Sequence, residues 1–259
     1  MSFPVRIALS LLDRPDRHRY GGDRSQHAEL RLPTGSGPFP VVVLLHGGSW
    51  TDRFSRVVMR PLARDLARRG MASWNVEFRR LGGGGGWPAT FLDVAAGIDA
   101  LADLADPRLD LTDVSLVGHS SGGQLALWAA GRSTLPGPAV GASPRVIPAR
   151  VVALAPVTQL QRSGDSALAL MGSRPAGEPE RWRQADPMCA APLPVPLLLV
   201  HPGADVTIPA ARSREYVERA RNVGSVVTLV TPDGEGHRDA IDPTSRSWRS
   251  AAEWLMAQR

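Results

Sequence analysis

The stretch that decides the fold lies in the middle of the chain, where residues 114–131 are VSLVGHSSGGQLALWAAG. The first four residues, Val114–Val117, are mostly apolar and are typical of a buried strand, whereas the residues after Gly122 have the spacing of a helix. Between them, Gly118-His119-Ser120-Ser121-Gly122 has the spacing Gly-x-Ser-x-Gly. Such a tight strand-to-helix turn needs its glycines and exposes the central hydroxyl above the sheet. Ser120 is therefore the candidate nucleophile.

Segments with strand and helix patterns alternate on both sides of this turn. The expected strands are residues 41–45, 71–78, 114–117, 151–154, 195–200 and 226–230, and the expected helices are residues 56–69, 87–104, 121–131, 210–222 and 244–258. Residues 27–32 alternate polar and apolar, which is typical of an antiparallel edge strand. Repeated strand–helix alternation predicts an α/β fold, with a mostly parallel, doubly wound sheet covered by helices on both faces. Because no linker interrupts the series, we expect a single domain over residues 1–259.

Composition excludes several classes of protein. Apolar residues make up 43% of the 259 residues, which is enough for a large core, and no run approaches the ~18 apolar residues of a membrane span. The formal net charge is +5 and every basic residue is Arg, but these alternate with Asp and Glu, which argues against a nucleic-acid-binding face. The apolar run at 7–12 is too short for a signal peptide.

The single cysteine and the glycine run indicate no cofactor. Cys189 has no partner for an internal disulfide and excludes a zinc finger or an iron–sulfur cluster, and it fits a cytoplasmic location. The run Gly82–Gly86 is not followed by Gly-Lys-Ser/Thr, so it does not predict a phosphate-binding loop. We therefore expect neither a metal nor a cofactor.

A second glycine-containing motif follows the first buried strand directly. It is His46-Gly47-Gly48-Ser49-Trp50, whose small residues allow the backbone to approach a substrate. Backbone N–H groups stabilise the negative oxygen of a tetrahedral intermediate well. We assign this role to the N–H groups of Gly48, Ser49 and Ser121, and a structural role to His46. Ser121 is the nearest competitor as nucleophile, but it lies off the centre of its motif.

The two motifs together resemble the α/β-hydrolase superfamily, in particular its His-Gly-Gly-x-Trp esterase/lipase branch, which includes kynurenine formamidases and acyl esterases. Asn75-Val76-Glu77-Phe78-Arg79-Arg80 and the segment from Trp87-Pro88-Ala89 to Asp93 resemble the segments that follow in this branch. The resemblance extends from Tyr20 to the last helix. It implies an α/β-hydrolase fold with a small cap insertion and a chain order of nucleophile, acid and histidine.

The acid and the base are expected after the last two strands. Asp205 lies five residues beyond the strand that ends at Val200, just before a helix, and is the expected acid. His237 is the last histidine of the chain, in the loop after the strand that ends at Val230. His237 would take the proton of Ser120, and Asp205 would orient the imidazole. The weaker alternatives for the acid, all on the His237 loop, are Asp233, Glu235 and Asp239.

The substrate pocket is less well defined by the sequence. Residues 157–187 lie where this fold carries its cap, and we expect a small cap there. Trp50, Met171 and Trp182 are candidate pocket residues, although packing in the interior is the alternative for each. A second hypothesis is an ion pair between Glu77 and Arg79 near the site.

The predicted function is that of a serine hydrolase that cleaves carboxylic esters with small or medium acyl groups through an acyl-enzyme. The main alternative is an arylformamidase, which uses the same machinery on an amide of the N-formylkynurenine type. A peptidase and a non-catalytic binding protein on the same fold are weaker alternatives. We expect a small-molecule ester or amide as the partner, without nucleic acid or membrane, and the sequence leaves the oligomeric state open.

Overall fold

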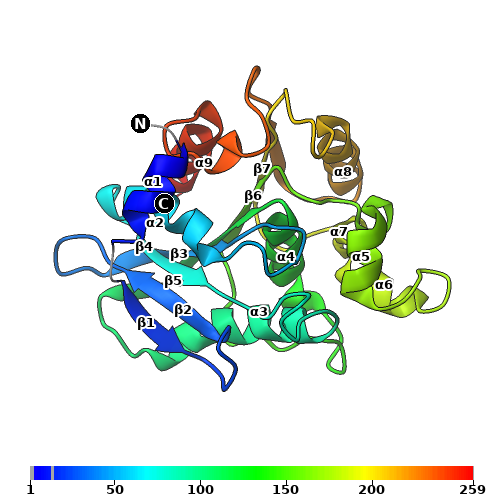
Figure 1. Cartoon of the computed structure of the whole chain (residues 1–259), viewed down its shortest axis with the longest axis horizontal. Helices are drawn as coiled ribbons and strands as arrows, with labels where there is room; N and C mark the ends of the chain where they lie inside the picture. The colour runs from blue at the N-terminus through cyan, green and yellow to red at the C-terminus, as the bar shows by residue number, and fades with distance from the viewer. Residues whose placement is uncertain (1–2, 13–14, 259) are drawn as a thin grey trace.

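The computed structural model describes residues 3–12 and 15–258. Eight strands form one sheet (Figure 1), and their bounds are β1 Asp16–Arg19, β2 His27–Arg31, β3 Phe39–Leu45, β4 Ala72–Val76, β5 Leu109–His119, β6 Arg150–Leu154, β7 Leu197–Val200 and β8 Val227–Val230. The α-helices are α1 Phe3–Ser10, α2 Arg60–Arg68, α3 Ala89–Asp99, α4 Ser121–Ala130, α5 Gly164–Met171, α6 Pro179–Ala185, α7 Pro187–Ala190, α8 Ala210–Asn222 and α9 Arg246–Ala257. Short 3₁₀ helices are η1 Arg56–Met59, η2 Ala100–Asp103, η3 Arg132–Thr134, η4 Leu160–Arg162 and η5 Asp239–Ile241.

The strand order is β1-β2-β4-β3-β5-β6-β7-β8. All pairs from β4 to β8 are parallel, whereas β1 and β2 run antiparallel to their neighbours. The expected mostly parallel sheet is therefore confirmed. The carboxyl ends of β3, β5, β7 and β8 lie at one edge of the sheet, so the loops that carry the candidate site residues meet there.

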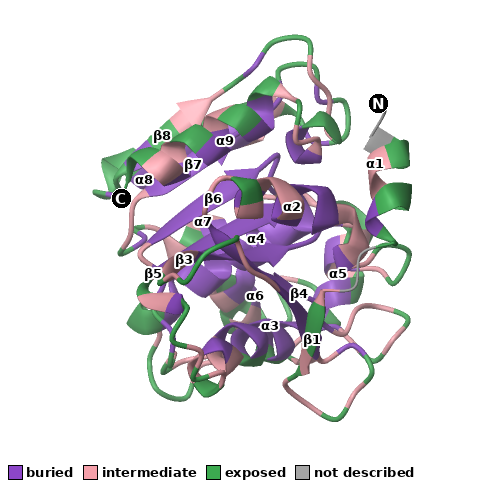
Figure 2. Ribbon diagram, turned by 90° about the vertical axis from the view of Figure 1, so that its left-hand side faces the viewer, coloured by how far each residue is buried: buried purple, intermediate pink, exposed green. Residues whose placement is uncertain are grey.

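Helices cover both faces of the sheet. Alternate side chains of β3 show which helices lie on which face. Val41, Val43 and Leu45 point to a core that includes residues of α3, α4 and α8. Val42 and Leu44 point to the opposite core, which contains residues of α2 and α9. Figure 2 shows the buried middle of the sheet between the helices, whereas the edge strands β1 and β8 are largely intermediate or exposed. Such a sheet, buried on both faces, explains why its strands are continuous apolar runs.

The structure corrects the expected edge of the sheet. Residues 27–32 were expected to form the edge strand, but β2 pairs with β1 on one side and with β4 on the other. The edge is β1, a four-residue strand with the sequence Asp-Arg-His-Arg. Its polar sequence has no alternation with apolar residues, so no pattern predicted a strand. Its charged side chains are typical of an edge strand, because charges discourage pairing with another chain.

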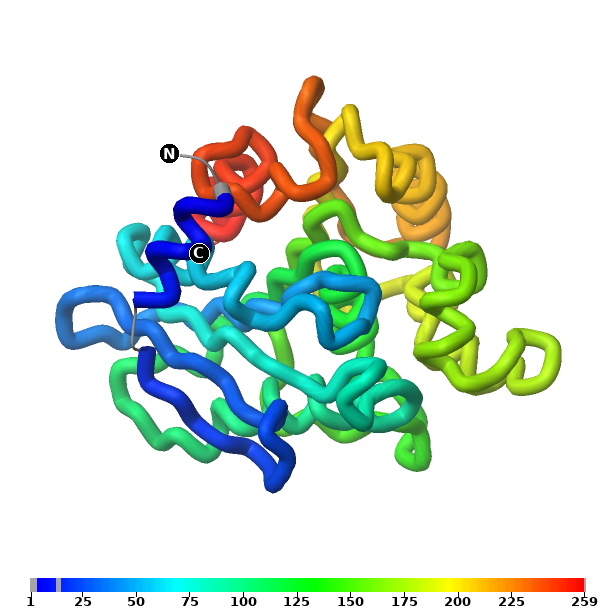
Figure 3. Tube along the Cα trace, in the orientation of Figure 1, coloured from blue at the N-terminus to red at the C-terminus, as the bar shows by residue number. Residues whose placement is uncertain are grey.

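The N-terminal helix is a further difference. The run at 7–12 belongs partly to α1, which lies beside the C-terminal part of the chain (Figure 3). An ion pair of 3.8 Å between Arg6 and Asp242 connects the two regions. Among the described residues, no helix is both long and apolar enough to cross a membrane.

Candidate active site

Ser120 lies at the turn between β5 and α4 with an unusual backbone conformation. Its φ of 55° and ψ of −119° are strained for a residue with a side chain. The two motif glycines explain how the turn closes. A Cβ on Gly118 would lie 2.1 Å from the carbonyl oxygen of Gly122, and one on Gly122 would lie 2.2 Å from that of Leu45. The start of α4 therefore packs against β3 and β5 so closely that only glycine fits at both positions.

The structure brings Ser120, His237 and Asp205 together from three separate strand ends. The Nε2 atom of His237 lies 3.0 Å from the Ser120 Oγ, and its Nδ1 lies 2.7 Å from Asp205 Oδ2. In a neutral imidazole, the Nδ1–H then donates to the carboxylate and leaves Nε2 to accept the serine hydroxyl proton. This arrangement can activate a serine for attack on a carbonyl carbon.

Asp205 is held in place by more partners than the sequence indicated. Its Oδ1 accepts hydrogen bonds from the backbone N–H groups of Thr207 and Ile208, at 2.8 and 2.9 Å. His201 Nε2 lies 3.3 Å from Oδ2, the oxygen that faces His237. Burial alone would raise the pKa of Asp205, but the hydrogen bonds from His201, His237 and the Ile208 amide outweigh it and lower that pKa strongly. The carboxylate therefore stays charged opposite His237.

His119, the residue before Ser120, contacts His237 directly. Its Nε2–H donates to the main-chain oxygen of His237 at 3.0 Å, and the two rings lie 4.8 Å apart. Burial lowers the pKa of His119 to about 3, with a further contribution from His237. His119 is thus a neutral side chain that fixes the backbone of the His237 loop.

The loop after β3 turns back toward Ser120. A Cβ on Gly47 would lie 2.9 Å from the Cβ of Ser120, so only glycine allows this approach. Gly48 and Ser49 follow with positive φ values of 126° and 52°. Among the described residues, the backbone N–H groups of Gly48, Ser49 and Ser121 donate no hydrogen bond, so all three remain available to a ligand.

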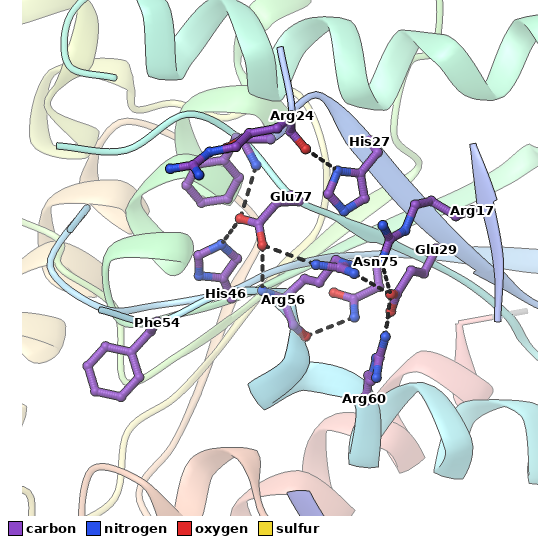
Figure 4. A network of polar contacts seen from close by, with 12 residues as sticks. Arg17, Arg24, His27, Glu29, His46, Phe54, Arg56, Arg60, Asn75 and Glu77 are labelled. Carbon is purple, nitrogen blue, oxygen red and sulfur yellow. Dashed lines mark hydrogen bonds and ion pairs between the residues drawn. The ribbon is translucent and has the colours of Figure 1, made fainter. Parts of the chain in front are cut away.

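Beneath this loop lies a network of buried charged side chains (Figure 4). Glu77 Oε1 lies 3.0 Å from His46 Nε2, and Glu77 Oε2 accepts from the backbone N–H of Arg56 at 3.2 Å. The His46 ring stacks on Phe78 at 4.5 Å. Burial would raise the pKa of Glu77, but His46, Arg80 and the Arg56 amide lower it to about 2. The network braces the loop from below, as expected for His46.

The hypothetical Glu77–Arg79 ion pair is wrong. Arg79 binds Asp93 instead, with its Nη2 2.7 Å from Oδ1, while Glu77 contacts Arg80 and Arg56 at 3.2 and 3.4 Å. Residues 77 and 79 lie beyond the end of β4. There Glu77 forms ion pairs with Arg56 and Arg80, and Arg79 forms one with Asp93.

A cavity of about 440 Å³ contains Ser120 and His237 in its lining. Its apolar wall comes from helix α1, from the segment around η1 and from η5; these residues are Pro4, Ile7, Phe54, Val58 and Ile241. The polar residues of the lining are Ser49, His119, Thr207 and Arg238, besides Ser120 and His237. The cavity can hold a small or medium ester next to the hydroxyl of Ser120.

The predicted pocket residues lie elsewhere. Trp50, Met171 and Trp182 are 3%, 0% and 1% exposed, and all three belong to the core on the α3, α4 and α8 face. Trp50 donates its Nε1–H to Gln124 Oε1 at 3.1 Å, which fixes the ring inside the protein. No residue of the expected cap 157–187 lines the cavity. Several apolar side chains of that segment pack in the core, and its role as a cap stays a prediction.

Sequence reasoning missed several residues around the site. His119 and Arg238 are sequence neighbours of Ser120 and His237, and that proximity was the available signal. Pro4 and Ile7 could not be recognised from the sequence, because they lie far from Ser120 and His237 along the chain and line the same cavity only in the fold. Among residues 3–12 and 15–258, no group of three His, Cys, Asp or Glu side chains is arranged to hold a metal ion.

A comparison with known protein families agrees with this geometry. A family model named BD-FAE matches residues 29–219, which is most of the chain. The chain belongs to the BD-FAE family. The matched region contains Ser120, Asp205 and the loop after β3, whereas His237 and helix α1 lie outside it.

Relatives of this BD-FAE member include a curated protein and many solved structures. Esterase LipC of Mycobacterium tuberculosis is 26% identical in an alignment of 245 positions that covers 84% of this chain and 58% of LipC. This chain therefore spans little more than half of that relative. Esterase B from Lactobacillus rhamnosis has a TM-score of 0.81 at 19% identity, over 98% of this chain and 90% of that one. A truncated carbohydrate esterase from gut microbiota has a TM-score of 0.80 at 19% identity, over 93% and 94%. The structural likeness establishes the shared fold.

Proposed function

We propose that the protein is a serine hydrolase that cleaves carboxylic esters with small or medium acyl groups. The observation that carries the proposal is the position of the His237 imidazole, with Nε2 3.0 Å from the Ser120 Oγ and Nδ1 2.7 Å from Asp205. Relatives named as esterases support the same chemistry. They favour esters over the formamides that the sequence left as the alternative.

The proposed reaction proceeds in two steps. As the Ser120 Oγ forms a bond to the carbonyl carbon, its proton passes to His237 Nε2, and Asp205 stabilises the resulting imidazolium. The tetrahedral intermediate collapses, the bond to the leaving oxygen breaks, and that oxygen takes the proton from Nε2. Water then attacks the acyl-enzyme by the same route and releases the acid and Ser120.

The negative oxygen of the intermediate needs hydrogen-bond donors near Ser120. The free N–H groups of Gly48, Ser49 and Ser121 supply them in this proposal. Losing one such donor in a serine hydrolase typically costs about 2.7–4 kcal/mol of barrier height. A cytoplasmic location stays a prediction from the single cysteine.

The test is covalent labelling with a fluorophosphonate, followed by peptide mapping. We expect one adduct, on Ser120, and hydrolysis of 4-nitrophenyl acetate and butyrate that is lost in Ser120→Ala. Asp205→Asn should lower kcat about 10⁴-fold, because the imidazole loses its correct tautomer. Asp233→Asn, on the His237 loop, is the matched control and should retain activity. Labelling of Ser121 instead, or no labelling of folded protein, would refute the proposed nucleophile.

A further inference from the structure

The cavity at Ser120 contains one permanently charged side chain among its described lining residues, Arg238. Arg238 is exposed and follows His237 directly in the chain. The apolar part of the lining includes Ile7, Phe54 and Val58. Arg238 is the one Arg, Lys, Asp or Glu among the described lining residues, so its positive charge attracts an anionic group of a ligand to the cavity.

The acidic residues near Arg238 are all engaged elsewhere. Glu235 accepts hydrogen bonds from the backbone N–H groups of Arg246 and Ser247. Asp239 accepts from the Gly236 N–H at 2.7 Å. Asp242 accepts from Thr244 at 2.8 Å and faces Arg6 at 3.8 Å. Within the described part of the chain, the Arg238 guanidinium therefore has no carboxylate partner.

The position of Arg238 also indicates which part of a substrate it faces. In the proposed reaction, His237 gives its proton to the leaving oxygen, so the leaving group lies on the His237 side of the cavity. Arg238 belongs to the same loop, at the start of η5. Arg238 also adds a minor contribution, after burial and His237, to the lowered pKa of His119, which lines the same cavity.

We infer that Arg238 binds a carboxylate on the alcohol part of the substrate, and that the protein selects esters whose leaving group is anionic. This inference rests on the proposed ester hydrolysis and adds the substrate class to it. A guanidinium presents its N–H groups as a planar fork that matches a carboxylate. The apolar wall would contact the uncharged remainder of the substrate.

The test compares two esters of equal size that differ in charge, 4-acetoxybenzoate and 4-acetoxybenzamide. The quantity measured is the ratio of their kcat/KM values within each protein variant, so a general loss of activity cancels. We expect the wild type to favour the anionic ester about fivefold, the size of an ion pair at a partly exposed site. Arg238→Gln should bring the ratio to about 1, and Arg238→Lys should keep part of it. The preference should also fall as salt is raised.

A matched control removes the same charge away from the site. Arg174 is an exposed arginine between α5 and α6 that does not line the cavity, so Arg174→Gln should keep the wild-type ratio. A ratio near 1 in the wild type, or an unchanged ratio in Arg238→Gln, would overturn the inference while Ser120-dependent hydrolysis upholds the proposed function.

Failure of the proposed function has a different signature, which is no Ser120-dependent hydrolysis of either ester. The inference is then decided by calorimetric binding of the two compounds to Ser120→Ala. Tighter binding of 4-acetoxybenzoate that is lost on adding Arg238→Gln supports an anion site, and equal binding of the two compounds refutes it.

Discussion

The segment between β6 and β7 and the helix α1 both lie outside the sheet, but different forces hold them. In the first, Leu160, Met171 and Trp182 are buried in the apolar core. In α1, the main-chain oxygens of Leu9 and Ser10 accept hydrogen bonds from arginines of α2, and Val5 and Leu9 are 45% and 39% exposed. The segment with the large apolar side chains stabilises the fold, whereas the more lightly held helix borders the cavity.

Buried charged side chains hold α1 against the rest of the protein. Arg60 donates to the Ser10 carbonyl oxygen and also to Glu29 Oε2, at 3.0 and 2.8 Å. Arg56 joins Glu29 to Glu77, at 2.6 and 3.4 Å. The network in Figure 4 thus connects the support of α1 to the loop after β3 that approaches Ser120. Ion pairs depend on pH and apolar packing does not, so the two regions should respond differently to acid.

The largest expected effect concerns the apolar region. Trp182→Ala should lower the free energy of unfolding by about 3–5 kcal/mol, because it removes a fully buried indole and leaves a cavity. The loss should stay constant with pH, and kcat/KM per fluorophosphonate-labelled site should stay near the wild-type value. Urea unfolding at several pH values and active-site titration measure both. Arg183→Ala, on the exposed side of the same helix, should change stability by less than about 0.5 kcal/mol.

A changed acyl-chain preference in Trp182→Ala would contradict this contrast between the two regions, because it would mean that the segment between β6 and β7 contacts the substrate. The sequence left a pocket and core packing as alternatives, because large apolar side chains fit either. Only the contacts across the fold distinguish the two.

Other parts of the fold and site were more predictable from sequence, for physical reasons. The strand–helix alternation and the turn at Ser120 depend on local sequence. Strands of a parallel sheet that is buried on both faces are continuous apolar runs, so they can be recognised in the sequence. Asp205 and His237 could be placed because chain order and strand ends limited the choice. By contrast, β1 has no apolar pattern, and the contact of Ile7 with the site joins distant parts of the chain. The partner of Glu77 depended on which arginine the folded backbone brought nearest.

The next effect tests the charged region. Glu77→Gln should lower the free energy of unfolding by about 3 kcal/mol at neutral pH, because the fall in the Glu77 pKa from 4.5 to about 2 corresponds to that energy. This pKa is lowered in the folded protein, so the stabilisation is complete above about pH 4.5 and is lost as the pH falls to about 2. The difference between wild type and variant should therefore shrink across that window, as followed by urea unfolding.

Glu180→Gln is the matched control for charge, since Glu180 forms an exposed ion pair with Arg183. It should have little effect at any pH. Equal pH dependence in Glu77→Gln and Trp182→Ala would remove the distinction between the two regions.

The smallest effect concerns the wall that α1 contributes. Ile7 is partly exposed and lines the cavity, so Ile7→Ala should change stability by less than about 1 kcal/mol. It removes about 40 Å² of apolar contact with a longer acyl chain, which is roughly 1 kcal/mol and about fivefold in kcat/KM. We expect that loss for 4-nitrophenyl hexanoate and almost none for the acetate, whose two carbons lie close to Ser120. Val5→Ala, on the exposed side of the same helix, is the control and should leave both rates unchanged. If the acetate lost as much as the hexanoate, α1 would act by holding the site together, like the buried segment, and not as a wall for the substrate.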